Sequence, residues 1–387
     1  MAAKVVLAPR PKIVGMTIPL HASTDKVACD LGLGDRSRVD GCPGALSFHH
    51  AADGAIGRVR FPGGVMSATQ FAQFAQLATD FGDGDIHLTT RGNVQIRGIS
   101  DEAGFSTSVL SSGFVPSIAH DKIRNIIASP LSGLEELVAE LDRALLKDEE
   151  LAGLSGRTLF GLDNGDGAIL AQQPDFGIFM GEQPQLILGG KLTTKTLANP
   201  AEDIAQLSVQ WQRARGNAWR VAEKPEFIAF DTMTFTSSDP THIGWFDRED
   251  GTVSLGAGLP FGVLPRKVAE LLCAVEKPVQ VTPWHSVLVH NLDEGEAEAV
   301  AKVLAPMGLI FDAHSPKLQV TACTGLPGCA KSRSDVRRDA LQLMVAGDSE
   351  GRVHFSGCER RCGHPRVEYT DYLALGDGEY EVTENRG

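Results

Sequence analysis

Apolar residues recur with helical spacing in several segments of the chain. In residues 67–78 the side chains of Phe71, Phe74 and Leu77 fall on one face, and Ser67 can cap the helix N-terminus. Residues 134–146 form a second helical pattern, whose apolar face consists of Leu134, Leu137, Leu141 and Leu145. Residues 201–216 also have a helical pattern. These segments predict helices that each pack one face against a core.

Other segments alternate apolar and polar residues, as half-buried strands do. Residues 55–61 predict one strand, and residues 86–98 predict two strands joined at Arg91-Gly92-Asn93. Residues from Asp163 to Gly167 are interpreted as a turn between strands, because they lack the downstream glutamate of a calcium-binding loop. Strands mixed with helices indicate an α+β protein.

The order of strand, Gly/Pro turn, helix and strand occurs twice, first near residues 55–98 and again near residues 252–291. Aligned without a gap, Thr89 corresponds to Thr282, Arg91 to Trp284 and Arg97 to His290. We interpret this recurrence as an internal duplication.

Length and composition limit the classes of protein to which this chain can belong. The 387 residues leave room for two or more domains, and 42% hydrophobic with 22% charged residues is ordinary for a globular protein. A net charge of −13 argues against nucleic-acid binding, which needs a basic surface. No segment approaches the ~20 apolar residues of a membrane span, and no secretory signal is recognised at the N-terminus. We therefore expect a cytoplasmic protein with reduced thiols and no membrane partner.

Six arginines gather in the N-terminal third of this acidic chain. They could meet a ligand that carries several carboxylates, although any one of them could equally be a solvated surface charge. The six are Arg36, Arg38, Arg58, Arg60, Arg91 and Arg97.

Four of the seven cysteines form two pairs near the C-terminus, Cys323 with Cys329 and Cys358 with Cys362. Thiolates are the soft ligands of iron–sulfur clusters, and a 4Fe–4S cube uses four of them. Two disulfides would suit a small secreted domain better. Structural zinc is usually bound by pairs with shorter spacing than that of the first pair. The four cysteines are thus predicted to bind an iron–sulfur cluster.

The spacing Cys-x5-Cys followed by Cys-x3-Cys is similar to the cluster motif of the sirohaem-dependent sulfite and nitrite reductases, in which the last cysteine also bridges to the sirohaem iron. Two further segments carry a resemblance. An arginine shortly before Cys42-Pro43-Gly44 resembles the opening of the precorrin-3B synthases, which are relatives of those reductases. Arg124-Asn125, followed by Ala128-Ser129-Pro130, resembles the family segment that opens the first large domain.

The resemblance implies a pseudo-twofold α+β architecture of two ferredoxin-like half-domains and two larger α/β domains. The boundaries expected from it follow the sequence in order. They are an N-terminal extension at 1–35, a first half-domain at 36–105, a first α/β domain at 106–245, a second half-domain at 246–310, and a second α/β domain with the cluster at 311–387.

The precorrin-3B synthases carry out the oxygen-dependent conversion of precorrin-3A to precorrin-3B in aerobic cobalamin biosynthesis, by hydroxylation and lactone formation. The resemblance implies NADH as electron donor, a 4Fe–4S relay and O2 as co-substrate. A mononuclear non-haem iron is a further candidate cofactor, with ligands that the sequence does not identify. No GxGxxG signature is visible, so a separate reductase is a candidate partner. The substrate-binding candidates are Arg58, Arg91, Arg97 and Arg124.

Two other functions stay open. A sirohaem-dependent sulfite or nitrite reductase is the alternative within the fold, but Arg157 and Leu159 stand where those enzymes carry a Lys-x-Lys pair for the anion. A non-catalytic iron–sulfur electron carrier or sensor is the alternative from another class.

Two expectations concern the last part of the chain. A helix is expected to start in residues 330–338, with its N-terminus directed at the anion that the cysteines hold. The acidic residues after Tyr369 are expected to be loosely packed.

Overall fold

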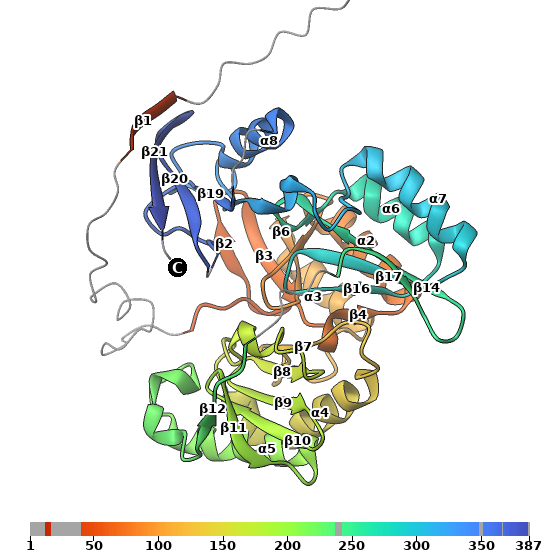
Figure 1. Ribbon diagram of the computed structural model, residues 1–387, viewed down its shortest axis with the longest axis vertical. Coiled ribbons are helices and arrows are strands. Elements are labelled where there is room, and N and C mark those ends of the chain that lie inside the picture. Colours follow the sequence, from red (N-terminus) through yellow and green to blue (C-terminus); the bar gives the residue numbers. More distant parts are fainter. Residues whose placement is uncertain (1–11, 17–39, 237–241, 348–350, 366, 386–387) are drawn as a thin grey trace, which may run out of the picture. The chain divides into compact units, whose positions relative to one another are not determined.

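The computed structural model describes residues 12–16, 40–236, 242–347, 351–365 and 367–385 (Figure 1). Arg36, Arg38 and most of the predicted N-terminal extension lie outside these residues. The chain divides into a large unit, Ser23–His50 with Gly54–Ala313, and a C-terminal unit, Met1–Ala22 with Ala51–Asp53 and His314–Gly387. The finer domain boundaries given above stay predictions.

The first repeat of the large unit contains the elements that the sequence pattern predicts. Ser67 caps its helix α2 in a capping box with Gln70, and Phe71, Phe74 and Leu77 are buried on one face. The elements are β3 (Gly54–Val59), β4 (Val65–Met66), α2 (Ala68–Phe81), β5 (Ile86–Leu88), β6 (Val94–Ile99) and α3 (Glu102–Ser111).

The second repeat has the same order of elements, which confirms the predicted recurrence. It consists of β14 (Val253–Gly258), β15 (Val263–Leu264), α6 (Arg266–Val275), β16 (Val279–Val281), β17 (Ser286–Leu292) and α7 (Glu294–Leu304). Both repeats place a residue with positive φ after the first strand, Gly63 in the first and Phe261 in the second.

Each repeat gives one short strand to the sheet of the other. The first sheet has the order β15-β5-β6-β3-β2, with β2 at His49–Ala51, and the second has the order β13-β14-β17-β16-β4, with β13 at Gly244–Asp247. Val263 pairs with His87, and Met66 pairs with Val279. Because of this exchange, buried residues of both repeats form a single hydrophobic core.

Between the repeats lies a six-stranded sheet with two helices. Its strand order is β12-β11-β10-β9-β8-β7, and its core includes the predicted apolar residues Leu141 and Leu145. The elements are β7 (Ile126–Ala128), α4 (Glu135–Lys147), β8 (Phe160–Asp163), β9 (Phe176–Met180), β10 (Pro184–Leu188), β11 (Lys191–Thr196), α5 (Pro200–Ala214) and β12 (Thr232–Met233). The predicted α+β class is therefore confirmed.

The C-terminal unit contains a five-stranded sheet of order β1-β21-β20-β19-β18 and helix α8 (Val336–Ala346). Its strands are β1 (Lys12–Met16), β18 (Val320–Ala322), β19 (Val353–Ser356), β20 (Tyr369–Gly376) and β21 (Glu379–Asn385).

One expectation for this unit was wrong. The residues after Tyr369 are not loosely packed: they form two paired strands, in which Leu373, Tyr380 and Val382 are buried. The alternating polar residues of these strands reflect one solvated side. The helix that was expected to start in residues 330–338 is present and begins at Val336, where Asp335 caps it by accepting a hydrogen bond from the Arg338 N–H. No helix in the described ranges has the length and apolar character that a bilayer span requires.

Candidate functional site

The four cysteines of the predicted cluster all lie in the C-terminal unit. Strand β18 leads into Cys323, and β19 leads into Cys358. The two strands are parallel neighbours, with Ala322 opposite Phe355. Since parallel strands end at the same edge of a sheet, both cysteine pairs begin at one edge.

Backbone hydrogen bonds join the two cysteine loops. The Cys323 N–H donates to the Phe355 carbonyl oxygen at 3.0 Å, and the Gly357 N–H donates to Cys323 Sγ at 3.2 Å. At Gly357 a Cβ atom would lie 2.1 Å from the hydroxyl oxygen of Ser332, so the position requires glycine. This close approach brings a backbone donor to the first thiol.

The four thiols form no disulfide and influence one another electrostatically. Burial raises the pKa of Cys362, and the neighbouring sulfurs of Cys323, Cys358 and Cys329 raise it further. Burial also raises the pKa of Cys323, although the hydrogen bond from Gly357 opposes the shift. A thiol whose pKa is raised is stabilised as a thiolate when it binds a metal cation.

The donor set fits an iron–sulfur cluster better than a single ion. Within the described parts of the chain, no group of three or more His, Cys, Asp or Glu side chains could hold one metal ion. A cube puts each thiolate on a different iron atom, so its four ligands need not converge on one point. The predicted mononuclear iron has no evident ligand set in this part of the structure.

A second cluster of functional side chains lies in the large unit, near Cys42. Arg58, Arg91 and Arg157 are within electrostatic range of the Cys42 thiol, and Arg220 is close to Arg91. We call Arg58, Arg91, Arg157 and Arg220 the arginine group. Two of its members were candidates from the sequence.

Arg91 sits in the tight turn between β5 and β6. The Thr89 hydroxyl accepts hydrogen bonds from the N–H groups of Arg91 and Asn93, at 3.4 and 3.1 Å. Gly92 has a φ of +61°, and a Cβ there would lie 3.3 Å from Ile127 Cγ2. The Arg91 guanidinium forms no hydrogen bond or ion pair with any residue that the structure describes. The turn thus fixes the backbone and leaves the cation available.

Two carboxylates partly balance the arginine group. Asp40 accepts hydrogen bonds from the Ser155 hydroxyl at 2.6 Å and the Cys42 N–H at 3.1 Å, and it lies 3.5 Å from Arg157 Nε. These contacts outweigh burial and hold the pKa of Asp40 below its usual value.

Asp175, the second carboxylate, is buried and accepts the N–H groups of Leu159 and Val221. Arg220 Nε lies 2.6 Å from Asp175 Oδ2 but is not aimed along a hydrogen bond, so this contact is an ion pair.

Four guanidinium groups beside two carboxylates leave an excess of positive charge. Burial, and then the neighbouring charges of Arg220 and Arg58, lower the pKa of Arg91 to about 10 against the opposing effects of Cys42 and Asp175. The buried Nε of Arg58 has no partner, while its terminal nitrogen donates to Gln95 at 3.3 Å. An anionic ligand would relieve both deficits. The arginine group is thus a candidate site for carboxylates.

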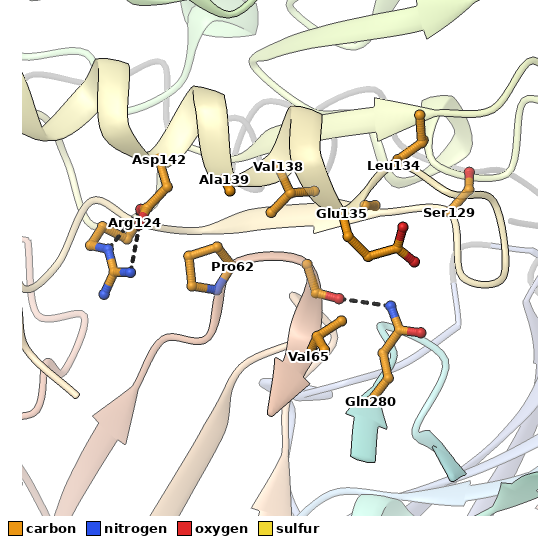
Figure 2. Close-up of a pocket in the computed structure, with 12 residues that line it drawn as sticks. Pro62, Val65, Arg124, Ser129, Leu134, Glu135, Val138, Ala139, Asp142 and Gln280 are labelled. Carbon is orange, nitrogen blue, oxygen red and sulfur yellow. Dashed lines mark hydrogen bonds and ion pairs between the residues drawn. The ribbon is translucent and has the colours of Figure 1, made fainter. Parts of the chain in front are cut away.

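The other predicted arginines that the structure describes are engaged elsewhere, although Arg60 lies within electrostatic range of Cys42, Arg58 and Arg91. Arg124 is buried and forms two 2.7 Å hydrogen bonds with the carboxylate of Asp142, beside a cavity of about 280 Å³ (Figure 2). Arg60 is buried and donates to Asn125 and to two backbone carbonyls. Arg97 is buried near Asp83. At least Arg124 and Arg60 are held by protein partners.

Leu159 lies beside the arginine group but offers no charge. It is 2% exposed and belongs to an apolar cluster with Ile127 and Ile169, against which Trp284 packs. The backbone N–H of Leu159 donates a hydrogen bond to the Asp175 carboxylate at 2.9 Å. Leu159 is therefore part of an apolar wall.

Sequence reasoning missed three parts of this site: Asp40, Asp175 and Arg220. None of them stands in a motif or a periodic pattern, and Asp175 meets Arg220 only through the fold. Arg157 was noticed for its position alone. Its guanidinium carbon lies 4.6 Å from the centre of the Trp219 ring, a contact that the sequence did not indicate.

Comparison with known proteins agrees with this arrangement of two repeats. Residues 49–103 match the nitrite/sulfite reductase ferredoxin-like half domain. The fold resembles that of the NirA protein of Mycobacterium tuberculosis, with a TM-score of 0.61 and 16% identity over 85% of this chain and 73% of that one. The first repeat and the fold are therefore similar to those of the sulfite/nitrite reductase superfamily.

The chain is 24% identical to a precorrin-3B synthase of Sinorhizobium sp, over 87% of this chain and 81% of the relative. It is also 22% identical to a ferredoxin–nitrite reductase of Synechococcus elongatus, over 81% of this chain and 74% of that enzyme. These relatives indicate an oxidoreductase-type enzyme.

Proposed function

We propose that this protein is a precorrin-3B synthase, which hydroxylates precorrin-3A with molecular oxygen and closes a lactone. The observation that carries the proposal is Leu159, buried in an apolar wall where an anion reductase needs a cation. A small oxyanion would lose a charge-assisted contact of about 1.5–3 kcal/mol there. The similarity to a precorrin-3B synthase over most of both chains supports the same function.

The arginine group would bind the carboxylates of the substrate. Arg91 supplies a guanidinium without a partner in the described structure, and Arg58 supplies a buried N–H group in the same state. Arg157 and Arg220 are kept in place by Asp40 and Asp175, which partly cancel their charges, so the excess positive charge comes mainly from Arg58 and Arg91. A protein with a net charge of −13 could thereby hold a polyanion at one place.

The reaction needs two electrons, because one oxygen atom enters the substrate as a hydroxyl group and the other leaves as water. NADH would supply both electrons, directly or through a separate reductase, and an acetate side chain of the substrate would close the lactone. A 4Fe–4S cluster on Cys323, Cys329, Cys358 and Cys362 would pass electrons singly when bound. The four thiols, with the Gly357 N–H at Cys323, are the residues that would hold it.

The test begins with protein purified without air, for which iron, sulfide and haem are measured together with the absorption spectrum. The protein is then supplied with precorrin-3A, O2, NADH and a general electron-transfer reductase. We expect a product that contains one additional oxygen atom, taken from isotopically labelled O2, and a lactone. Cys358→Ser should lose most iron and sulfide and the activity with them.

A sirohaem-dependent reductase is the main rival, supported by the nitrite reductase relative. A strong sirohaem spectrum and efficient reduction of sulfite or nitrite, without a product from precorrin-3A, would move the function to that rival. Leu159→Lys sharpens the distinction, because a buried lysine beside Ile127 and Ile169 should impair the proposed reaction. A gain of anion reduction in that variant would show that Leu159 alone separates the two activities.

A further inference from the structure

A buried carboxylate lies beneath the second cysteine pair. Asp371, on β20, is 0% exposed. The adjacent strand β19 runs parallel to β20 and places His354 opposite Asp371. A fully buried carboxylate is costly unless it is paired and hydrogen-bonded, so its partners show what it stabilises.

The partners of Asp371 come from the two ends of one loop. The Ser356 hydroxyl donates to Asp371 Oδ1 at 2.7 Å, two residues before Cys358. Arg361 Nε donates to Asp371 Oδ2, one residue before Cys362. Asp371 therefore holds the segment that enters the Cys358–Cys362 loop and the segment that leaves it.

Arg361 itself needs such support. Its φ is +46°, a conformation that residues with a side chain seldom adopt, and its N–H closes the loop by donating to the Cys358 carbonyl oxygen at 3.1 Å. The ion pair with Asp371 fixes the side chain of this residue from below. The pair also places a neutralised guanidinium, rather than a free positive charge, next to the last cysteine.

We propose that Asp371 is a positioning residue for the cluster, which sets the geometry of the Cys358–Cys362 loop and cancels the charge of Arg361 beside Cys362. The proposal rests on the presence of the cluster, as the proposed function does. It does not depend on which substrate the enzyme oxidises or reduces. Partners that orient metal ligands typically change metal affinity ~10- to 100-fold when removed.

The experiment uses the full chain with its cluster, purified without air. Asp371→Asn preserves size but leaves the Arg361 charge uncompensated. We expect the variant to release iron to a chelator ~10-fold faster or more. We also expect a higher midpoint potential of the cluster, because an uncompensated cation stabilises the more negative reduced form.

The sign of the shift in midpoint potential distinguishes a role of Asp371 in positioning and charge from a role in protein stability alone. Arg361→Gln, which leaves the buried carboxylate unpaired, should shift the potential downward, and the double variant should return toward the wild-type value. Asp339→Asn is a matched control: Asp339 is also buried, accepts from Tyr380 and Ser334, and pairs with Arg338. It should lower the melting temperature without the shift in potential.

Several outcomes would overturn the proposal. Asp371→Asn with a wild-type iron-release rate and potential, but a lower melting temperature, would reduce Asp371 to a structural residue. If that variant does not fold, an Arg361→Gln variant with unchanged iron release and potential would equally overturn the proposal. Wild-type protein that binds no cluster would refute the cluster itself, and with it both this proposal and the electron relay.

Discussion

The two repeats of the large unit share a backbone turn but differ in the side chain that it presents. In the first, Thr89 accepts the N–H of Arg91, and the Thr89 N–H donates to the residue four positions later, Asn93. In the second, Thr282 accepts the N–H of Trp284 and donates to Ser286, again four positions later. The alignment of the repeats is therefore reproduced in hydrogen bonds.

The difference between the turns shows that the fold was kept while the chemistry separated. Arg91 is a half-buried cation without a hydrogen-bond or ion-pair partner in the described residues, whereas Trp284 packs on the Ile127, Leu159 and Ile169 cluster. One turn supplies positive charge, and the other supplies an apolar surface. Substitutions at the equivalent positions Arg91 and Trp284 should thus impair different properties, ligand binding in the first repeat and stability in the second.

Arg91→Ala should produce the largest effect, on ligand binding. Loss of a charge-assisted contact should weaken the binding of a carboxylate-rich tetrapyrrole by ~10- to 150-fold, as measured by equilibrium titration. The iron content should not change. Arg266→Ala, which removes an exposed arginine paired with Glu270 in the second repeat, is the control and should bind normally. Equal affinity of the Arg91 variant would remove this residue from the site.

Trp284→Ala should mainly reduce stability. The side chain is only partly buried, so we expect a loss of about 2 kcal/mol in the free energy of unfolding, less than for a fully buried tryptophan. Denaturant unfolding measures it. Trp245→Ala is the control, because Trp245 is 41% exposed and should cost less. A Trp284 variant that loses ligand affinity but no stability would contradict the division of roles between the turns.

His290, which aligns with Arg97, should make the second repeat sensitive to acid. Burial, with the nearby Arg248, lowers the pKa of His290 to about 4, although Glu135 opposes the shift. The neutral ring bonds Ser254 and Gln280. The folded state then binds fewer protons than the unfolded state, whose ordinary histidine pKa is about 6.5. Stability should fall as the pH decreases from about 6.5 toward 4.

This loss should be ~1–2 kcal/mol, since the ring is not completely buried. The measurement is the free energy of unfolding as a function of pH, for the wild type and for His290→Gln. The variant should have a shallower slope in that window. An unchanged slope would mean that other groups cause the acid sensitivity.

The smallest effect is expected from the shared threonines. Thr89→Val removes the hydroxyl that accepts the N–H groups of Arg91 and Asn93. Thr282→Val removes the hydroxyl that accepts the Trp284 N–H and bonds the Ser286 hydroxyl. Each change should cost about 1 kcal/mol. Chemical denaturation of both variants tests whether the turns are energetically equivalent. If one variant loses more than twice as much free energy of unfolding as the other, the two turns share their geometry but not their energetic contribution.

Local sequence patterns were sufficient for the parts of the structure that depend on local burial. Helix α2, its cap at Ser67 and the recurrence of elements follow from apolar periodicity and from the residue types that cap helices. The pattern failed after Tyr369, where polar residues alternate along two paired strands. The acidic composition of these residues indicated that some side chains are exposed to solvent, but it was not evidence that the segment lacks secondary structure.

The arginine group shows the limit of such reasoning. Arg58 and Arg91 were candidates because they belong to the N-terminal set of arginines and because of the family resemblance, but Arg124 looked equivalent and is instead bound to Asp142. Asp40 reaches Ser155 across 115 positions of sequence. Which cation keeps a free guanidinium depends on which carboxylate the fold brings to it.

The sequence alone determined the cysteine spacing, the duplicated order of elements and the charge balance of the chain, because these depend on residue identity and on neighbours along the backbone. Only the tertiary structure decided that the repeats exchange strands, that Leu159 closes an apolar wall and that Asp371 supports the loop before Cys362. The reason is physical. Burial and ion pairing are set by distances between residues that are far apart in the chain, and only the folded chain fixes those distances.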